Sequence, residues 1–292
     1  MSDSSFSKDF LWGAAAASAQ IEGGWKDGGR TPSIWDMATK KQVKHGETCH
    51  TACDHYHRWK EDVALMKEMG LKSYRFSISW SRVIPEEGKV NPEGLKFYSD
   101  LVDELLANGI EPLVTIFHWD LPMWVYKKGG WLSEGIVPLF REYTKVVVEA
   151  LSDRVKWWMT INEPGCFIMN GYMQGAHAPF KRDYLALSRL SRNCMLVHAA
   201  SVKAIRQYAK QPVKVGIAFS TGAWVPENET PAENCPVSKT LDLLSGKWTP
   251  ASWATAGGWI PCWQANPSGL TAFMPLTKGI WRKSHSLWIL SA

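Results

Sequence analysis

The sequence predicts an α/β fold with a parallel sheet, and three observations carry that prediction. Short runs rich in apolar residues alternate with longer stretches of helical periodicity over residues 10–219. Two of the helical stretches end at a glycine, a residue that commonly terminates a helix. Regular alternation of strand and helix is typical of parallel strands joined by helical crossovers.

The first part of this region predicts three strands and two helices. Residues 10–14 are a short apolar segment and form the first predicted strand. A helical pattern follows at 54–70, and residues 71–79 alternate polar and apolar side chains as a strand does. Residues 92–109 have proline near the start and glycine at the end, which favours a helix, and they precede a buried strand at 111–117.

The second part continues the alternation. Helices are predicted at 137–151 and 184–210, and strands at 155–161 and 214–219. No Gly-x-Gly-x-x-Gly motif follows the first strand, which disfavours a dinucleotide-binding fold. The predicted architecture is therefore a (β/α)8 barrel, truncated after about its fifth strand.

The composition is that of an ordinary globular protein, except for its tryptophan content. The 292 residues are 45% hydrophobic and 21% charged, and the net charge is +5. Most of the excess positive charge lies in residues 235–292, so nucleic acid is not an expected partner of the nearly neutral remainder. The chain contains 17 Trp residues, six of them in the last 58 residues. Several of the eleven in residues 1–234 lie near His, Asn and carboxylates in the sequence, and flat apolar rings among such polar groups suit a sugar site.

Three further features predict the compartment. Six cysteines do not make a disulfide framework in a chain of this size. The first residues lack an apolar stretch behind a basic start, and no apolar run reaches the length of a membrane span. We therefore expect a cytoplasmic protein without a membrane partner, and the sequence leaves its oligomeric state open.

Polar side chains occupy the ends of four successive predicted strands, which is where barrel enzymes place their active sites. In chain order they are Gln20 and Glu22, then Arg75, Trp80 and Arg82, then His118, Trp119 and Asp120, and finally Asn162 and Glu163. A carboxylic acid beside an amide, with a His, a Gln and Trp rings around it, suits glycoside hydrolysis. In that reaction one carboxyl protonates the leaving oxygen while neutral groups hold the ring hydroxyls.

Four segments resemble, in the same order, the strand-end motifs of glycoside hydrolase family 1, the β-glucosidase family. They are FLWGAAAASAQIEGG (10–24), RFSISWSRV (75–83), FHWDLP (117–122) and TINEP (160–164). The resemblance covers about residues 8–230 and implies a (β/α)8 barrel that hydrolyses β-linked glucosides with retention. One position departs from the family signature, because Ala19 stands where an aromatic residue, Asn or His is usual.

The resemblance also implies roles for individual side chains. Glu163 would be the general acid/base, and Asn162 would hold the 2-hydroxyl of the sugar. Gln20, His118 and Trp119 would bind the far side of the same ring. Since relatives that cleave thioglucosides can replace the acid with Gln, the presence of Glu favours ordinary O-glycosides.

Arg75 would neighbour the catalytic nucleophile, although an arginine inside a strand can also simply pair with a buried acid. Structural alternatives exist for three other candidates as well. Glu163 could be a structural acid, and His118 and Gln20 could be polar core residues that bind no sugar. These alternatives stay open at the level of the sequence.

A group of cysteines and histidines superficially resembles a zinc site. It comprises Cys49, His50, Cys53, His55 and His57. The group lacks the paired Cys-x-x-Cys spacing that makes such a signal specific. The surrounding stretch ACDHYHRWKEDV also resembles the family, where it begins a barrel helix without a metal. We therefore predict no metal and no cofactor.

The retaining mechanism needs a second carboxylate, about 5–5.5 Å from the first. The family supplies it from a Thr-Glu-Asn-Gly motif, and the 292 residues contain no such motif. Glu229, in an Asn-Glu-Thr sequence, has neither the flanking residues nor the position. We therefore predict that this chain lacks the nucleophile and is inactive alone.

Residues 1–234 are the predicted N-terminal part of the barrel, whereas residues 235–292 are predicted to be a frameshifted and poorly ordered tail. When residues 258–267 are read one nucleotide earlier, the codons force an Asp and permit a family-like Asp-Pro…Gly…Pro string. The same shift over 285–292 forces an Asp and permits Asp-Phe-x-Gly, which resembles the family's sixth-strand motif. A natural, divergent Trp-rich tail is the alternative.

The sequence as a whole predicts a β-glucosidase that acts on β-linked glucosides at the non-reducing end, with a small-molecule glucoside or oligosaccharide as its partner. One alternative is a non-catalytic fragment that binds β-glucosides without turnover. Another is a product without a stable fold. The choice among glucose, galactose, fucose and a 6-phosphosugar is open, and so is the aglycone.

Overall fold

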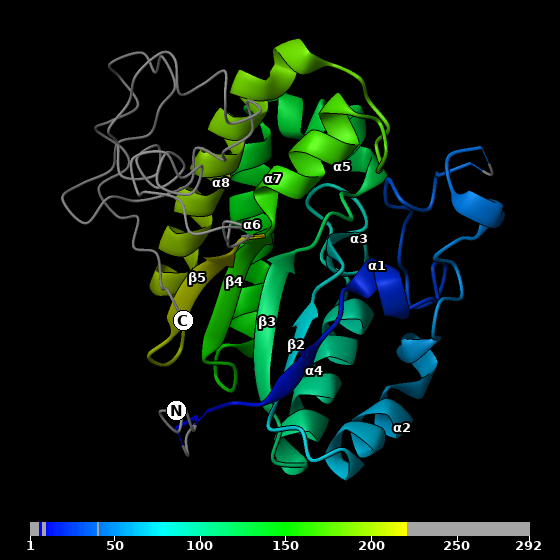
Figure 1. Ribbon diagram of the computed structural model, residues 1–292. Helices are drawn as coiled ribbons and strands as arrows, with labels where there is room; N and C mark the ends of the chain where they lie inside the picture. The colour runs from blue at the N-terminus through cyan, green and yellow to red at the C-terminus, as the bar shows by residue number, and fades with distance from the viewer. Residues whose placement is uncertain (1–5, 8–9, 40, 221–292) are drawn as a thin grey trace, which may run out of the picture. The chain divides into compact units, whose positions relative to one another are not determined.

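The computed structural model describes residues 6–7, 10–39 and 41–220 (Figure 1). Its described strands form one sheet in the order β1-β2-β3-β4-β5, and every neighbouring pair is parallel. The strands are β1 (Gly13–Ala15), β2 (Ser73–Ser77), β3 (Glu111–Phe117), β4 (Trp157–Asn162) and β5 (Lys214–Ala218). The predicted parallel sheet of five strands is confirmed. Because the strands run the same way, their carboxyl ends meet at one edge.

Long helices connect successive strands, as the periodicity predicts. They are α2 (His55–Glu68), α4 (Pro92–Ala107), α6 (Ile136–Leu151) and α8 (Leu187–Tyr208). Shorter helices lie in the connections, most of them after the carboxyl ends of the strands. They are α1 (Ser18–Ile21), η1 (Lys44–Gly46), α3 (Trp80–Val83), α5 (Met123–Lys127), η2 (Gly130–Leu132), α7 (Pro164–Cys166), the π-helix η3 (Phe167–Met173) and η4 (Tyr184–Ala186).

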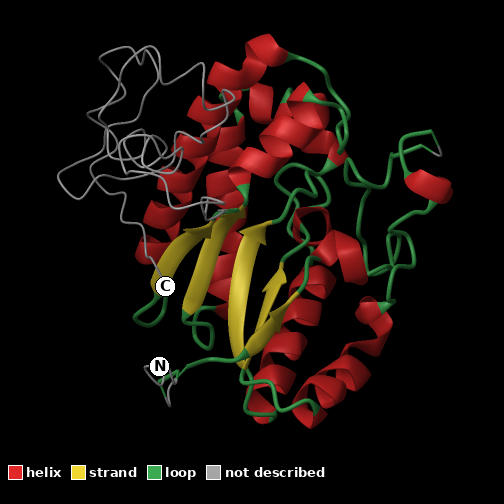
Figure 2. Ribbon diagram, viewed as in Figure 1, coloured by secondary structure: helices red, strands yellow, loops and turns green. Residues whose placement is uncertain are grey.

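The long helices lie on the same side of the sheet (Figure 2). Each packs against the next one along the chain, so that α2 contacts α4, α4 contacts α6 and α6 contacts α8. This follows from the strand order, since crossovers of one hand between consecutive parallel strands place every helix on the same face. Among the described residues, no helix has both the length and the apolar character that crossing a membrane requires.

The strand β1 begins later than predicted, at Gly13 instead of residue 10. Trp12 accepts main-chain hydrogen bonds from Lys72 and Ser73, at 2.8 and 3.1 Å, but lies before the strand and is 55% exposed. The first strand approaches β2 very closely here, because a Cβ at Gly13 would lie 2.1 Å from Ser73 Oγ. Only glycine fits at this point of the sheet.

The two faces of the sheet differ in their side chains. Tyr74 and Phe76 are buried on the side that the helices cover, whereas Arg75 points to the other side and donates to Thr115 Oγ1. The end of β4 breaks this alternation. Met159 pairs with Gly216 and Asn162 pairs with Ala218, so β4 contains one extra residue. Such a bulge changes the face of the sheet to which the following side chains point.

The extra residue explains the opposite directions of two side chains in β4. Thr160 contacts α8 through a 2.7 Å hydrogen bond with His198 Nδ1. In a regular strand Asn162 would share that face with Thr160. Instead, Asn162 contacts Arg75 on the other side of the sheet. The bulge therefore places the last residue of β4 at the edge where the predicted site residues meet.

Candidate active site

Side chains from three strands form a hydrogen-bonded group at the carboxyl edge of the sheet, here called the site cluster. It consists of Arg75, His118, Trp119 and Asn162. Arg75 Nη2 donates to Asn162 Oδ1 at 2.5 Å, and Trp119 Nε1 donates to Asn162 O at 2.8 Å. Asn162 Nδ2 lies 2.9 Å from His118 Nε2, and Asn162 itself is only 2% exposed. Four of the strand-end residues singled out in the sequence are thus brought together.

The hydrogen bonds of Asn162 fix the proton on His118. Because Asn162 Oδ1 accepts from Arg75, the amide nitrogen is the donor and His118 Nε2 accepts. The ring proton is therefore on Nδ1, which is buried and has no partner among the described residues. Burial, with a contribution from the charge of Arg75, lowers the pKa of His118 to about 4. The imidazole is neutral at neutral pH.

Arg75 supplies the positive charge of the site. Its Nε donates to Thr115 Oγ1 at 2.9 Å, which fixes the guanidinium on the inner side of β2. Burial lowers the pKa of Arg75, and the nearby charge of Glu163 acts in the opposite direction. An arginine keeps its proton despite such a shift. Arg75 is therefore a fixed cation near enough to Glu163 for the two charges to interact, without an ion pair between them.

Glu163 is held by its backbone. Its φ of 43° and ψ of 64° place it in the left-handed region, and its N–H donates to Ala218 O at the end of β5, at 2.7 Å. Pro164 follows and begins α7. Within the described residues the half-buried carboxylate accepts no hydrogen bond and forms no ion pair. The main chain of Glu163 is thus fixed, while its carboxylate is unpaired within the described residues.

Trp119 shares the unusual backbone of Glu163, with a φ of 77°. A large side chain in this region costs about 1–3 kcal/mol, and such strain is concentrated at functional sites. Here the strain turns the Trp119 ring so that its N–H reaches Asn162 O. Glu163 directly follows β4, and Trp119 lies two residues after the end of β3.

Gln20 lies at the same edge but outside the site cluster. It is on α1, which directly follows β1, and its side chain is exposed. Its main-chain N–H donates to Ala17 O at 2.9 Å, whereas its amide forms no hydrogen bond with the site cluster. The predicted role of Gln20 in sugar binding stays a prediction.

Other strand-end residues have a packing role that the sequence did not distinguish from a site role. Arg82 Nε lies 3.2 Å from Glu22 Oε2, and Tyr98 OH donates to Glu22 Oε1 at 2.6 Å. These three residues are here called the salt-bridge cluster, and they are 0–4% exposed. Trp80 is fully buried and stacks on Tyr143 with ring centroids 4.7 Å apart.

Two aromatic side chains beside the site were not among the predicted residues. The ring of His177 lies between Trp35 and Trp119, with centroid distances of 5.6 and 5.5 Å. Burial lowers the pKa of His177, and its Nδ1 is buried without a partner among the described residues. Both residues belong to long connections that follow strand ends. That position is the signal that could have identified them.

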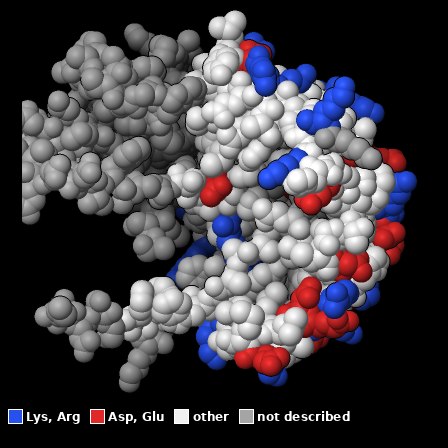
Figure 3. Space-filling view, turned by 45° about the vertical axis from the view of Figure 1, so that its right-hand side comes forward, with Lys and Arg blue, Asp and Glu red and all other residues white. Residues whose placement is uncertain are grey.

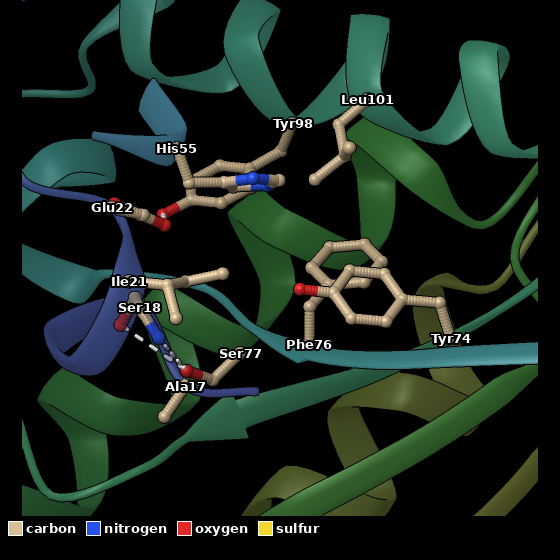
Figure 4. Close-up of a pocket in the computed structure, with 10 residues that line it drawn as sticks. All are labelled: Ala17, Ser18, Ile21, Glu22, His55, Tyr74, Phe76, Ser77, Tyr98 and Leu101. Carbon is tan, nitrogen blue, oxygen red and sulfur yellow. Dashed lines mark hydrogen bonds between the residues drawn. The ribbon is translucent and has the colours of Figure 1, made fainter. Parts of the chain in front are cut away.

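The pocket in Figure 4 lies elsewhere. Tyr74 and Phe76 of β2, Tyr98 and Leu101 of α4, and His55 of α2 contribute to its walls, together with residues of α1. It is therefore on the helix-covered side of β2, opposite Arg75. No member of the site cluster lines it, and we do not assign the sugar site to it.

The residues of the superficial zinc motif point to separate partners. Cys49 Sγ donates to Asp36 Oδ1 at 3.3 Å, and the ring of His50 stacks on Trp25 at 4.0 Å. His55 Nδ1 contacts Asp62 and His57 Nδ1 contacts Asp54, both at 2.6 Å. Among the described residues, no three His, Cys, Asp or Glu side chains are grouped so that they could hold a metal ion.

The chain is similar to β-glucosidases over most of its length. It is 46% identical over 227 residues to β-glucosidase A of Thermotoga maritima, covering 77% of this chain and 51% of that protein. It is 38% identical over 283 residues to an aryl-phospho-β-D-glucosidase of Bacillus subtilis, covering 92% and 59%. The chain therefore spans about half the length of the curated relatives that it matches.

A solved structure supports the same relationship. The β-glucosidase from Thermotoga maritima in complex with deoxynojirimycin has a TM-score of 0.76 and 41% identity, covering 86% of this chain and 59% of that chain. Such structures are TIM barrels, so the predicted barrel fold is confirmed, with the described sheet as part of it. The family model for glycosyl hydrolase family 1 matches residues 2–258, beyond the 8–230 region of the four motifs. The chain belongs to glycosyl hydrolase family 1.

Proposed function

We propose that the site cluster and Glu163 form the acid/base half of a β-glucosidase site. Glu163 would protonate the leaving oxygen of a β-glucoside, and Asn162 would hold the 2-hydroxyl of the sugar. The observation that carries this proposal is that the main chain fixes Glu163, whose carboxylate has no partner in the described residues, beside an Asn162 that Arg75 and His118 hold in place. A carboxyl held in this way can meet a substrate oxygen without first breaking a protein contact.

The rest of the site cluster suits the sugar ring itself. His118 is neutral, and its Nδ1–H has no partner within the described part of the chain, so it can donate a hydrogen bond to a hydroxyl. Trp119, with Trp35 and His177 beside it, offers aromatic faces to the apolar faces of a sugar or aglycone. Gln20 would bind the same ring from the end of β1.

The reaction also needs a second carboxylate, which would attack the anomeric carbon while Arg75 neighbours it. The family motif that supplies it is absent from the 292 residues. We propose that residues 235–292, which lie outside the described residues, come from a shifted reading frame. Sequencing the gene across codons 230–292 tests this, because a corrected frame should contain Asp-Phe-x-Gly and then Thr-Glu-Asn-Gly. Early stop codons in that frame would refute it.

A binding experiment tests the sugar site in the chain as it stands. We expect the 292-residue chain to bind deoxynojirimycin in a calorimetric titration and not to hydrolyse a nitrophenyl β-glucoside. Asn162→Ala should lower the affinity about 10- to 100-fold, since it removes a hydrogen bond in a charged, buried setting. Asn108→Ala, at the opposite end of the sheet where Asn108 caps α4, is the matched control. Equal affinities of the parent and Asn162→Ala would contradict the proposal.

A kinetic experiment tests the role of Glu163 in a frame-restored protein. Glu163→Gln should slow the hydrolysis of substrates with poor leaving groups by about 10²–10⁴-fold, because these need general acid assistance. Substrates whose leaving group needs no proton should be affected far less. Binding without turnover in the frame-restored protein would favour the alternative of a non-catalytic glucoside-binding protein.

The partner would be a small-molecule β-glucoside and the compartment the cytoplasm. Cys49, Cys53 and Cys194 carry free thiols, which supports a reducing compartment. On the face in Figure 3, acidic and basic side chains are interspersed along the rim, without one large basic patch. That distribution does not favour a nucleic-acid partner.

A further inference from the structure

Asp120 lies directly beside the site cluster without belonging to it. It follows Trp119 at the end of β3 and is fully buried. Its Oδ2 accepts a 2.8 Å hydrogen bond from Ser18 Oγ. Ser18 is the first residue of α1, the short helix that carries Gln20. One hydrogen bond thus joins the connections that follow β1 and β3, which bear different predicted sugar-binding residues.

Ser18 is also hydrogen-bonded to Ser77, the last residue of β2. The N–H of Ser18 donates to Ser77 Oγ at 2.8 Å, and Ser77 Oγ in turn donates to Ser18 Oγ at 3.2 Å. Figure 4 shows Ser18 and Ser77 facing one another across this pair of bonds. Ser18, Ser77 and Asp120 are 0–4% exposed. Water therefore does not compete for these bonds, and each holds its partner in one geometry.

Among the residues that the structure describes, Asp120 has no ionic partner. Glu22 forms its ion pair with Arg82 at 3.2 Å, and Asp36 forms its ion pair with Arg30 at 2.9 Å. Asp120 is the third carboxyl in a region with two guanidinium groups, and its bonded partner is a hydroxyl. Burial raises the pKa of Asp120 to about 7, although Ser18 and the charge of Arg30 oppose the shift. Asp120 therefore carries less than a full negative charge at neutral pH and can serve as a hydrogen-bonding link without binding a cation.

The position of Asp120 also matters for the strained turn at Trp119. The Trp119 ring is tied to Asn162 O, while the residue after it is tied to Ser18. A residue in a strained conformation persists only where its surroundings hold it from both sides. The bond between Asp120 and Ser18 is the second of the two contacts that fix this turn; the bond from Trp119 to Asn162 is the first.

We propose that Asp120 is a positioning residue that aligns Gln20 with His118 and Trp119 through its bond to Ser18. The proposal rests on the proposed function, because alignment of these side chains matters only if they bind the same ligand. Asp120 itself touches no substrate in this assignment. It sets the relative position of the two sides of the sugar site.

Hydrogen–deuterium exchange of the full 292-residue chain tests the alignment directly. Ser18→Ala removes the donor and Asp120→Ala removes the acceptor, so both should speed exchange in α1 about tenfold, the effect of one lost hydrogen bond. Asp120→Asn keeps an acceptor oxygen and should restore the parent rate. Ser152→Ala is the matched control, because its buried Oγ accepts from Lys210 N, far from the site edge.

Affinity for deoxynojirimycin, measured on the same variants, separates the two proposals. We expect it to fall about tenfold in Ser18→Ala and Asp120→Ala and to be retained in Asp120→Asn. Parent-like exchange of α1 in Ser18→Ala overturns the positioning role, whatever the chain binds. If α1 exchanges faster in Ser18→Ala but the parent chain does not bind deoxynojirimycin, the link between Asp120 and Ser18 is supported and the proposed function is refuted. Should Asp120→Ala fail to fold, Ser18→Ala, which removes only a hydroxyl, decides the matter.

Discussion

The site cluster and the salt-bridge cluster contain similar residues at the same edge of the sheet, but they differ in how completely their polar groups are paired. In the salt-bridge cluster, the Glu22 carboxylate faces both Arg82 and Tyr98. Beside the site cluster, the Glu163 carboxylate has no such partner among the described residues, and His118 Nδ1 has none either. Polar residues at strand ends are therefore ambiguous in a sequence. In the structure, a polar group whose hydrogen bonds and ion pairs are complete is interpreted as structural, and one with unpaired atoms as able to bind a ligand.

The largest expected effect is the loss of stability when a substitution breaks the ion pair of the salt-bridge cluster. Arg82→Met should lower the free energy of unfolding by about 3–5 kcal/mol, because Glu22 is left as a buried, unpaired charge. Urea denaturation measures the loss. Arg58→Met is the control, since Arg58 pairs with Glu61 at 2.8 Å on the exposed surface and should change stability little. Similar losses for both variants would show that the buried pair has no special role.

The next effect concerns the pH dependence of the site cluster. The pKa of His118 is about 4 in the folded chain, against about 6.5 when unfolded. The unfolded chain therefore binds the proton first, and stability is lost as the pH falls from about 6.5 to about 4. His118→Asn should lack this loss, so that its stability relative to the parent rises by on the order of 3 kcal/mol between pH 7 and pH 4. A constant difference across that range would contradict a buried neutral imidazole.

A smaller effect compares two tryptophan hydrogen bonds. Trp119→Phe removes the bond from Nε1 to Asn162 O and should weaken deoxynojirimycin binding by about 1 kcal/mol, or roughly fivefold. Trp124→Phe removes a similar bond, 3.0 Å to Ile84 O, outside the site and should leave the affinity unchanged. Calorimetric titration measures both. A comparable loss in the two variants would mean that the effect is general and not local.

The smallest effect is on the stability of Glu163→Gln. Because the carboxylate has no partner in the described residues, the substitution should change the free energy of unfolding by less than about 0.5 kcal/mol. Glu22→Gln, the equivalent change in the salt-bridge cluster, should cost several times more. Chemical denaturation of the two variants side by side measures the contrast. A loss above about 2 kcal/mol in Glu163→Gln would identify it as a structural acid.

The regular elements were predictable because they are long enough to show their periodicity. The bounds predicted for β3 agree with the structure, and those of α6 differ by one residue. Helices such as α3 and α7 have three or four residues, which is too short for any periodic signal. The late start of β1 depends on the close approach of Gly13 to Ser73, a contact between residues 60 positions apart. No local pattern contains that information.

The grouping of residues in the candidate site was predictable where it depends on strand ends and unpredictable where it depends on loops. His118 and Asn162 converge because parallel strands bring their carboxyl ends together. The structural role of Glu22 depends on Tyr98, which lies on the distant helix α4. His177 reaches Trp119 through a long connection whose path no periodicity defines. The extra residue in β4 also could not be predicted from the sequence, since it is defined only by the pairing of β4 with β5.

The anchoring of Glu163 through its main chain has a consequence for evolution. Its N–H bonds to Ala218 O whatever side chain the residue carries, so the backbone at this position is independent of the acid itself. A single nucleotide substitution that converts the Glu codon to a Gln codon would exchange the proton donor for an amide. The surrounding geometry would stay in place. Divergence of reactivity can therefore begin at this position before any other residue has changed.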